Sequence, residues 1–335
     1  MDTAFAILIV VIVFALIFDY INGFHDTANA IATVVATRVL SPLHAVAMAA
    51  ILNFLGAMSG TAVATTVGKG IVEPGAVTQE LVISALLSAI AWNLLTWYYG
   101  IPSSSSHALV FSIVGAGIAS GGLGVLGWVG IEKVLAGLVT SPLLGLACGF
   151  LFMVMLFRLF ARTHPAFISR FFGRAQLVSS IYMAFSHGSN DAQKTMGVIT
   201  MSLAAYYGWA GDDWEVPLWV ILAAATAMGL GTASGGWRII KTMGHKIVEL
   251  KPIHGFAAET TAATIIELAT RLGVPISTTH VISSTIMGVG ATGNRRAVHW
   301  GVAGNIVTAW IVTIPACVAM GWLFSTVLHI LLPNF

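Results

Sequence analysis

Residues 23–29 read Gly23-Phe24-His25-Asp26-Thr27-Ala28-Asn29, and residues 188–194 read Gly188-Ser189-Asn190-Asp191-Ala192-Gln193-Lys194. Each stretch places a glycine, polar side chains and a carboxylate inside a long apolar segment. A charged side chain at the centre of a bilayer costs ~2.5–3.5 kcal/mol on insertion scales, so it is interpreted first as functional. A single buried Asp could equally serve a structural ion pair, but two related copies favour a membrane transporter.

The composition of the chain is that of a protein embedded in a membrane. Of its 335 residues, 57% are hydrophobic and only 8% are charged, whereas soluble domains have roughly 25% charged residues. The mean hydropathy is +0.91. The first apolar run follows no basic residue and lacks a small-residue cleavage site, so we interpret it as a retained membrane segment. We predict an all-α polytopic membrane protein whose surroundings are a lipid bilayer and which has no nucleic-acid partner.

The two halves of the chain contain the same motifs in the same order. The Asp26 motif recurs 165 residues later around Asp191, and Pro-Ser-Ser-Ser-Ser-His at 102–107 recurs 173 residues later as Pro-Ile-Ser-Thr-Thr-His at 275–280. Such self-similarity indicates a duplication. We predict a first repeat over residues 1–160, a basic cytoplasmic linker over 161–174 and a second repeat over 175–335.

Several apolar stretches are too long or too short for simple membrane spans of ~20 residues. Stretches 3–37 and 175–208 are interrupted by the Asp motifs and are predicted to be discontinuous helices. Residues 79–119 and 253–290 are predicted to be helical hairpins with the Pro-Ser/Thr-His segments at their tips. Irregular backbone at membrane depth is tolerated only where it lines a cavity or is buried in protein. The remaining stretches are 43–67, 133–157, 217–236 and 297–332.

The distribution of basic residues predicts the orientation. With the N-terminus outside and both hairpins returning to the side that they enter from, eleven basic residues fall on the cytoplasmic side and only Lys69 and Lys133 fall outside. The halves then enter the membrane from opposite sides, so the duplication is predicted to be a pair of inverted-topology repeats. Such repeats place substrate and ions near the midplane. The eleven are Arg38, Arg158, Arg162, Arg170, Arg174, Arg238, Lys241, Lys246, Lys251, Arg295 and Arg296.

The motifs together predict a site for a small oxyanion. Asp26 and Asp191 are placed to cap the helices that follow them, and the hydroxyl clusters at 103–106 and 277–279 precede two further helices. Four helix N-termini would then offer unpaired N–H groups and partial positive charge. The alternative is that the hydroxyls only join helices. The candidate substrate-binding residues are Ser104, Ser105, Ser106, Ser277, Thr278, Thr279, Asn190, Gln193 and Lys194.

The carboxylates predict coupling to a cation. They would repel an anion strongly in a pocket of low dielectric constant, so a cation must neutralise them first. Either sodium at Asp26, Asn29 and Asp191 or protons on the carboxylates would make anion binding conditional on cation binding, which is symport. Lys194 aligns with Asn29 and either contacts substrate or replaces one cation site. The candidate cation-coupling residues are Asp26, Asn29, Asp191, Asn190 and His25.

Five other ionisable residues have open roles. His107 and His280 are either proton carriers or core histidines. Glu267 and Arg271 are spaced for an ion pair on one helical face, with the alternative that Arg271 faces the cavity. Glu259 is a candidate for gating, for ion binding or for a structural pair.

Residues 18–33 and 188–194 together resemble the paired signature of the inorganic phosphate transporter (PiT) family, and the segments 102–107 and 275–280 are similar to its repeated hairpin tips. The resemblance covers nearly the whole chain. It implies a secondary active symporter with alternating access that imports inorganic phosphate coupled to a sodium or proton gradient, with inverted repeats and a homodimeric assembly. No resident cofactor is implied.

Two departures from the family pattern are bacterial in type. His25 stands where many members have Asn, and Gln193-Lys194 replaces the Ala-Asn of the first copy. The resemblance therefore implies a multi-pass protein of a bacterial cytoplasmic (inner) membrane. Bacterial relatives include proton-coupled carriers of phosphate or of neutral complexes of phosphate with a divalent metal. They also include sulfate permeases, which form the alternative function.

Physical chemistry separates the alternatives. Hydrogen phosphate can donate its proton to a carboxylate, whereas sulfate only accepts hydrogen bonds at neutral pH, so an ionised Asp at the anion favours phosphate. An anion channel would need a continuous polar path, whereas paired motifs predict one closed site. An intramembrane hydrolase is disfavoured because Ser106 and His107 are adjacent and face different directions on a helix. We therefore predict no enzymatic activity.

Overall fold

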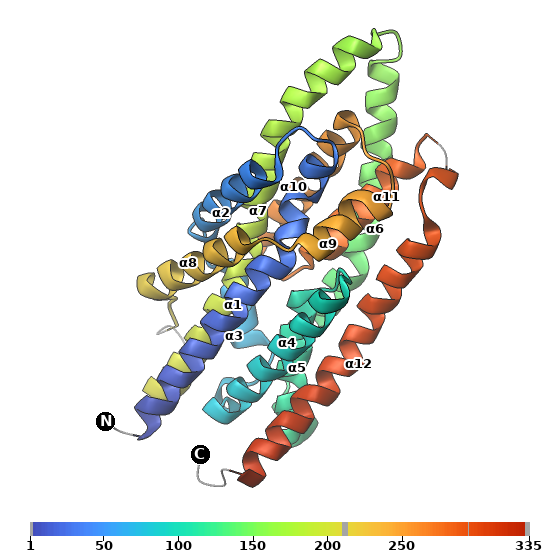
Figure 1. Ribbon diagram of the computed structural model, residues 1–335. Coiled ribbons are helices and arrows are strands. Elements are labelled where there is room, and N and C mark those ends of the chain that lie inside the picture. The colour runs from blue at the N-terminus through green and yellow to red at the C-terminus, as the bar shows by residue number, and fades with distance from the viewer. Residues whose placement is uncertain (1–2, 210–213, 294, 332–335) are drawn as a thin grey trace.

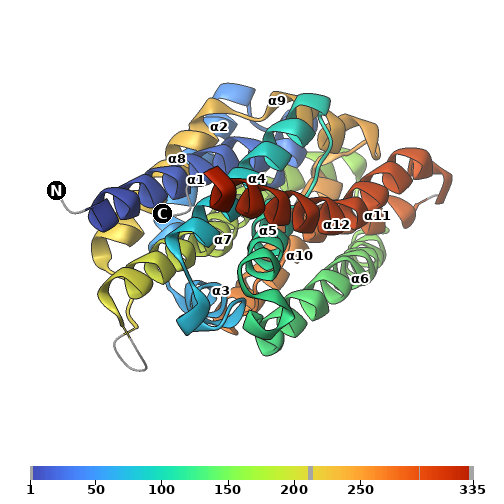
Figure 2. The same ribbon diagram turned by 90° about the horizontal axis from the view of Figure 1, so that it is seen from below.

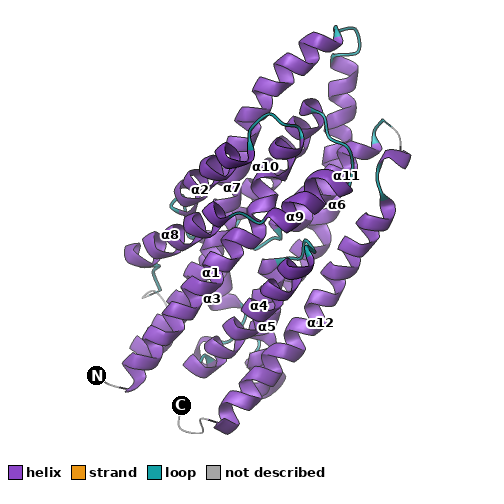
Figure 3. Ribbon diagram, in the orientation of Figure 1, coloured by secondary structure: helices purple, strands orange, loops and turns teal. Residues whose placement is uncertain are grey.

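The computed structural model describes residues 3–209, 214–293 and 295–331, and these residues form helices and turns without a strand (Figures 1 and 3). The first half contains α1 (Thr3–Ala36), α2 (Pro42–Ala57), α3 (Ala62–Gly70), η1 (Pro74–Ala76), α4 (Gln79–Tyr99), α5 (Ser105–Gly121), η2 (Gly122–Val125) and α6 (Trp128–Leu159). The second half contains α7 (Pro165–Tyr207), α8 (Leu218–Ser234), α9 (Trp237–Lys241), the π-helical turn η4 (Thr242–Lys246), α10 (Pro252–Arg271), α11 (Thr278–Ala291), η5 (Arg295–Ala297) and α12 (Trp300–Leu331).

The described helices confirm an all-α polytopic membrane protein. Five are long and apolar enough to cross a bilayer, namely α1, α4, α5 continued by η2, α6 and α12. Two bent pairs, α2 with α3 and α8 with α9–η4, raise that number to seven if each pair is one span. Figure 1 shows both chain ends at one end of the molecule and the turn between α6 and α7 at the other.

The prediction that the helices break at the Asp motifs is wrong, because α1 and α7 continue through them. The motif glycines instead let neighbouring helices approach closely. A Cβ atom on Gly23 would lie 2.5 Å from the carbonyl oxygen of Met228 in α8, and one on Gly188 would lie 2.5 Å from the Cα of Asn53 in α2. The breaks lie elsewhere, with bends of 69° between α2 and α3 and 59° between α8 and α9–η4.

Both predicted hairpins are present. Helix α4 packs on α5 and α10 packs on α11, and the chain turns between the members of each pair at 100–104 and 272–277. Ser104 and Ser277 cap α5 and α11, because each hydroxyl accepts a hydrogen bond of 3.2 Å from the backbone N–H three residues later. A serine in extended conformation before an apolar helix favours this geometry.

The packing of the two halves is reciprocal. Helix α5 lies along α12 and α11 along α6, while α2 lies along α7 and α8 along α1. Figures 1 and 2 show that α1 and α6 run toward the α6–α7 turn, whereas α7 and α12 run away from it. Inverted repeats would produce this arrangement, and the boundaries given for them stay a prediction. The predicted linker is largely helical, because α7 begins at Pro165.

The apolar core is divided by the motifs. On α1, Leu8, Val11, Ala15 and Phe18 belong to one buried cluster, and the residues from Ala28 to Val34 belong mainly to a second. The intervening turns contain Asp19, Asn22, His25 and Asp26, all buried. The polar site therefore lies between two apolar layers, where charge is poorly solvated.

The glycine contact between α7 and α2 is testable. Gly188→Ala should lower the free energy of unfolding by ~1–3 kcal/mol, because the added methyl group meets the rigid backbone of Asn53. The measurement is thermal unfolding in detergent. Gly173→Ala in the same helix is the matched control, since a Cβ atom there meets nothing within 4 Å. Equal stability of the two variants would contradict the close-packing role.

Candidate functional site

The tips of both hairpins meet the two motifs in the middle of the molecule. Ser105 Oγ lies 3.5 Å from His25 Nδ1, and Thr278 Oγ1 donates a 2.8 Å hydrogen bond to Asp191 Oδ2. Lys194 Nζ donates to Ser106 Oγ and, at 3.1 Å, to the carbonyl oxygen of Ile276. The N-termini of α5 and α11 therefore converge on α1 and α7.

Two helix N-termini meet here, and not the predicted four. Asp26 and Asp191 lie in the middle of continuous helices, so the predicted capping role of these residues is wrong. The two remaining N-termini still present N–H groups of their first turns without an intrahelical partner. Together with the hydroxyls of Ser105, Ser106, Thr278 and Thr279, they keep the donor character expected of an oxyanion site.

Asp191 is the centre of the second motif. Its carboxylate is buried, contacts Lys194 Nζ, and accepts from Thr278. His187 Nε2 lies 3.0 Å from Asp191 Oδ2, and His187 Nδ1 lies 3.1 Å from Asn53 Oδ1. The sequence analysis did not select His187. Its spacing of four residues before Asp191 is the signal that could have identified it, since such residues are neighbours on a helix.

Asp26 is the centre of the first motif. Its Oδ1 lies 2.6 Å from His25 Nδ1, and His25 Nε2 lies 3.0 Å from Thr96 Oγ1 on α4. Asn29 Nδ2 reaches the opposite hairpin and donates to Thr278 Oγ1 at 3.2 Å and to Thr279 Oγ1 at 2.9 Å. Thr96 is a further site residue that the sequence analysis did not select.

The two carboxylates lie close together. One oxygen of Asp26, one of Asp191 and one ring nitrogen of His187 all lie within 4.8 Å of one another. Two carboxylates and an imidazole can hold a cation. Asp26 and Asp191 thus lie as close together as the cation site predicted from the sequence requires.

Four predicted substrate-binding side chains have other partners. Gln193 Oε1 accepts from the N–H of Val63 at 2.8 Å, at the start of α3, and Asn190 Nδ2 donates to Thr270 Oγ1 of α10 at 2.7 Å. The hydroxyls of Ser104 and Ser277 cap α5 and α11. These four residues support the walls of the site.

The two repeated histidines lie directly behind the tips. The rings of His107 and His280 have centroids 4.8 Å apart, and His280 stacks on Trp310 at 4.0 Å. Within the described residues, no ring nitrogen of either histidine makes a hydrogen bond of normal geometry. The two rings therefore lie behind the hydroxyl clusters of the hairpin tips.

Glu259 lies in a separate polar cluster nearer the α6–α7 turn. Its carboxylate accepts hydrogen bonds from Thr33 at 2.5 Å, Ser179 at 2.5 Å, Ser180 at 2.9 Å and Gln176 at 3.1 Å. Uncharged donors from α1 and α7 therefore surround this buried carboxylate, and no Lys or Arg side chain is among its hydrogen-bond partners in the described part of the chain.

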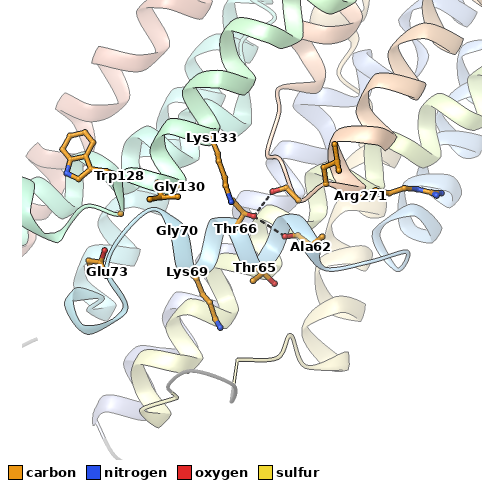
Figure 4. A pocket seen from close by; sticks show the side chains of 14 residues that line it. Ala62, Thr65, Thr66, Lys69, Gly70, Glu73, Trp128, Gly130, Lys133 and Arg271 are labelled. Carbon is orange, nitrogen blue, oxygen red and sulfur yellow. Dashed lines mark hydrogen bonds between the residues drawn. The ribbon is translucent and has the colours of Figure 1, made fainter.

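Arg271 forms the predicted ion pair and also lines a cavity outside the site of the two motifs. Its Nε donates to Glu267 at 2.9 Å, which confirms the predicted ion pair. It also lines a cavity of about 650 Å³ between α3, the start of α6 and the turn after α10 (Figure 4). Lys69, Lys133 and Glu73 line the same cavity. Gly273 also lines this cavity and lies three residues before Ile276, whose carbonyl oxygen accepts a hydrogen bond from Lys194.

Known proteins that this chain is similar to are described as phosphate transporters. The model of the family described as "Phosphate transporter family" matches residues 22–321. A Bacillus subtilis protein named "Probable low-affinity inorganic phosphate transporter" is 46% identical, over 99% of this chain and 100% of its own. A Rhizobium meliloti protein of the same name is 48% identical, over 93% and 94%. The solved structure entitled "The sodium-dependent phosphate transporter" has a TM-score of 0.89 at 29% identity, covering 97% of this chain and 99% of its own.

The pairing of Lys194 with Asp191 is testable through stability. Lys194→Met should lower the free energy of unfolding by ~3–5 kcal/mol, because it leaves a buried carboxylate without its cation. The double variant Asp191→Asn with Lys194→Met should regain most of that loss. Thermal unfolding in detergent compares the three proteins, and a double variant as unstable as the single one would show that the two side chains act independently.

Proposed function

Because the chain belongs to the phosphate transporter family, we propose that it imports inorganic phosphate by symport with a monovalent cation. As a member of that family, it is a multi-pass membrane transporter and not an enzyme. The bacterial relatives support placement in a bacterial cytoplasmic membrane. The proposal extends this coarse assignment to the site, the coupling and the transport cycle.

The observation that supports the proposal is the proximity of Asp26 and Asp191 beside two helix N-termini. The N-termini and hydroxyls suit the oxygen atoms of a small anion. The carboxylates can accept the proton of hydrogen phosphate, which sulfate lacks. The relatives reported above are named for phosphate, so the sulfate alternative gains no support from them.

Charge balance explains why a cation must accompany the anion. Asp26 and Asp191 are at most 3% exposed, and Lys194 supplies one permanent positive charge beside Asp191. Two unit charges 4 Å apart interact with ~4 kcal/mol at an effective dielectric constant of 20. A phosphate dianion would therefore be repelled unless Asp26 is also neutralised. Cation binding at Asp26 makes phosphate binding favourable, and neither ion is then transported alone.

Lys194 replaces one exchangeable cation in this proposal. It occupies the position that Asn29 has in the first motif, and its ammonium group contacts Asp191, Ser106 and the carbonyl of Ile276. Because the ammonium group of Lys194 stays at the second motif, the coupling cation binds at the first motif, where Asp26, His25 and Asn29 lie. The same ammonium group is positioned to contact a bound phosphate.

Both coupling ions have support. The structural neighbour is entitled a sodium-dependent transporter, and carboxylate and amide oxygens are ligands for hard cations. The contact of His25 with Asp26 at 2.6 Å equally suits a proton shared between the two side chains. A divalent metal entering with phosphate would meet Asp26, His187 and Asp191. No resident cofactor is required.

The buried position of the site favours alternating access over a channel. Asp26, Asp191 and Lys194 are each between 0% and 3% exposed, so both sides are closed and substrate can enter only after a conformational change. The hairpin tip that contacts Lys194 follows Gly273, which lines the cavity of Lys69, Lys133 and Arg271, so movement of this tip would connect that cavity with the motifs. Inverted repeats supply two equivalent arrangements for such a cycle.

Uptake into proteoliposomes tests the proposal directly. Radiolabelled phosphate and sulfate are offered separately under an imposed sodium gradient, an imposed pH gradient, or neither, each with and without Mg²⁺. We expect saturable uptake of phosphate that depends on one of the cation gradients. Uptake that does not saturate, or that is equal without any gradient, would contradict symport.

Loss of the first carboxylate should abolish coupling. Asp26→Asn keeps the size of the side chain but removes its charge, so we expect gradient-driven phosphate accumulation to fall to the background of empty liposomes. Asp191→Asn should have the same effect, because it leaves the charge of Lys194 uncompensated. Solubility and thermal stability in detergent verify folding. Normal accumulation by both folded variants would reject the coupling role.

The hydroxyls of the tips should affect anion affinity. Thr278→Ala and Ser105→Ala each remove one polar group at the site, and a net hydrogen-bond contribution of ~1 kcal/mol corresponds to an increase of about fivefold in the KM for phosphate. Thr140→Ala is the matched control, because Thr140 is exposed and its hydroxyl bonds only to its own helix. An unchanged KM would assign both residues to helix packing alone.

A further inference from the structure

Asp19 is a second ionisable group on the face of α1 that contains the first motif. It lies seven residues before Asp26, which is about two helical turns or ~10 Å along the axis. Its side chain is 0% exposed, and it lies within a helix apolar enough to cross the membrane. A buried carboxylate at this depth requires a compensating partner, because an isolated charge is expensive to desolvate.

Within the described residues, neither oxygen of the Asp19 carboxylate makes a hydrogen bond of normal geometry. Asn22 on the next turn of α1 and Thr195 on α7 have side-chain donors that act on it, but neither meets the geometry of a normal hydrogen bond. Asn22 Oδ1 and Thr195 Oγ1 are themselves buried without a hydrogen-bond partner. Four oxygen atoms that can act as acceptors, one of them a hydroxyl, thus gather without a positive charge.

The nearby Lys194 cannot neutralise Asp19 by direct contact. An ammonium group has three donors, and those of Lys194 go to Asp191, Ser106 and the carbonyl of Ile276. The other charged group that acts on Asp19 from α7 is Asp191, which is negative. Helix α8, which also packs on α1, contains no ionisable residue. On α1 itself the neighbouring ionisable groups are His25 and Asp26.

We propose that Asp19, together with Asn22 Oδ1 and Thr195 Oγ1, forms a second binding site for a monovalent coupling cation. Oxygen ligands that include one carboxylate suit a small hard cation, which is either a sodium ion or a proton taken from the gradient. The site lies on the side of Asp26 at which α1 begins, and the predicted orientation makes this the outer side. Its cation would thus bind before the substrate chamber is reached.

This inference rests on the proposed function and sharpens it. Around the two motifs, Asp19, Asp26 and Asp191 are three buried carboxylates and Lys194 is one buried ammonium group, while the buried Glu259 lies among uncharged donors in its own cluster. Two carboxylates therefore need exchangeable cations, so each transported phosphate should be accompanied by one cation more than Asp26 alone requires. Asp19 thereby contributes to the cation-to-phosphate ratio without touching phosphate.

The test uses Asp19→Asn, which keeps the shape and removes the charge. Radiolabelled phosphate uptake by the full-length protein in proteoliposomes is measured in a sodium series at fixed pH and in a pH series without sodium. The reversal potential gives the cation-to-phosphate ratio. We expect the half-saturating cation concentration to rise at least about tenfold, as for loss of a charged ligand, and the ratio to fall by one. A shift in the sodium series identifies sodium, and one in the pH series identifies the proton.

Two further variants and one assay control this test. Asp19→Glu retains the carboxylate and should keep the wild-type ratio. Thr195→Val keeps the side-chain volume, removes one oxygen and should raise the half-saturating concentration about threefold. Phosphate exchange at equal ion concentrations on both sides verifies that Asp19→Asn is folded and binds phosphate.

Wild-type cation dependence and ratio in folded Asp19→Asn would overturn the inference. If that variant does not fold, unchanged cation dependence in Thr195→Val overturns it instead. A wild-type protein whose phosphate uptake needs no cation would contradict the proposed function itself, so the two failures are distinguishable.

Discussion

The contact of Lys194 with Asp191 is the interaction on which the rest of the site depends. It places a cation and an anion side by side between two apolar layers, and each partner also binds a hairpin tip, Lys194 through Ser106 and Ile276 and Asp191 through Thr278. The two hairpins are thereby joined to α7 through charge-assisted hydrogen bonds, which are about twice as strong as neutral ones. A buried pair of this kind defines a geometry more than it adds stability.

The reciprocal packing gives this local contact a wider effect. Each hairpin packs within its own half, yet α5 lies along α12 and α11 lies along α6, while α2 and α8 cross to the opposite long helix. Gln193 adds a connection, because it accepts from the backbone of α3 while its own helix holds Asp191 and Lys194. Movement of one hairpin would therefore change contacts at the motifs of both halves.

Much of the architecture could be predicted from sequence, because hydropathy and repeated motifs depend on local composition. The hairpins, the meeting of Asp26 with Asp191 and the pair of Glu267 with Arg271 are examples. Which residues share a face of α1 or α7 could not be predicted, because the motifs were expected to interrupt these helices. In an unbroken helix, residues 187, 191 and 194 share one face, and 190 lies beside it, one turn before 194. This periodicity explains why His187 was missed. Substrate binding by Asn190 and Gln193 stays a prediction, and their side chains bond to Thr270 of α10 and to the backbone of α3.

The serine caps affect how the two hairpin tips separate from each other. Ser104 and Ser277 use their hydroxyls on their own helices, so the first turn of each tip is capped from within its own hairpin. A ligand held jointly by the two tips loses most of its contacts as soon as they separate by a few ångströms. Release then needs no change in the chemistry of any single side chain, only a change in the distance between two intact pieces.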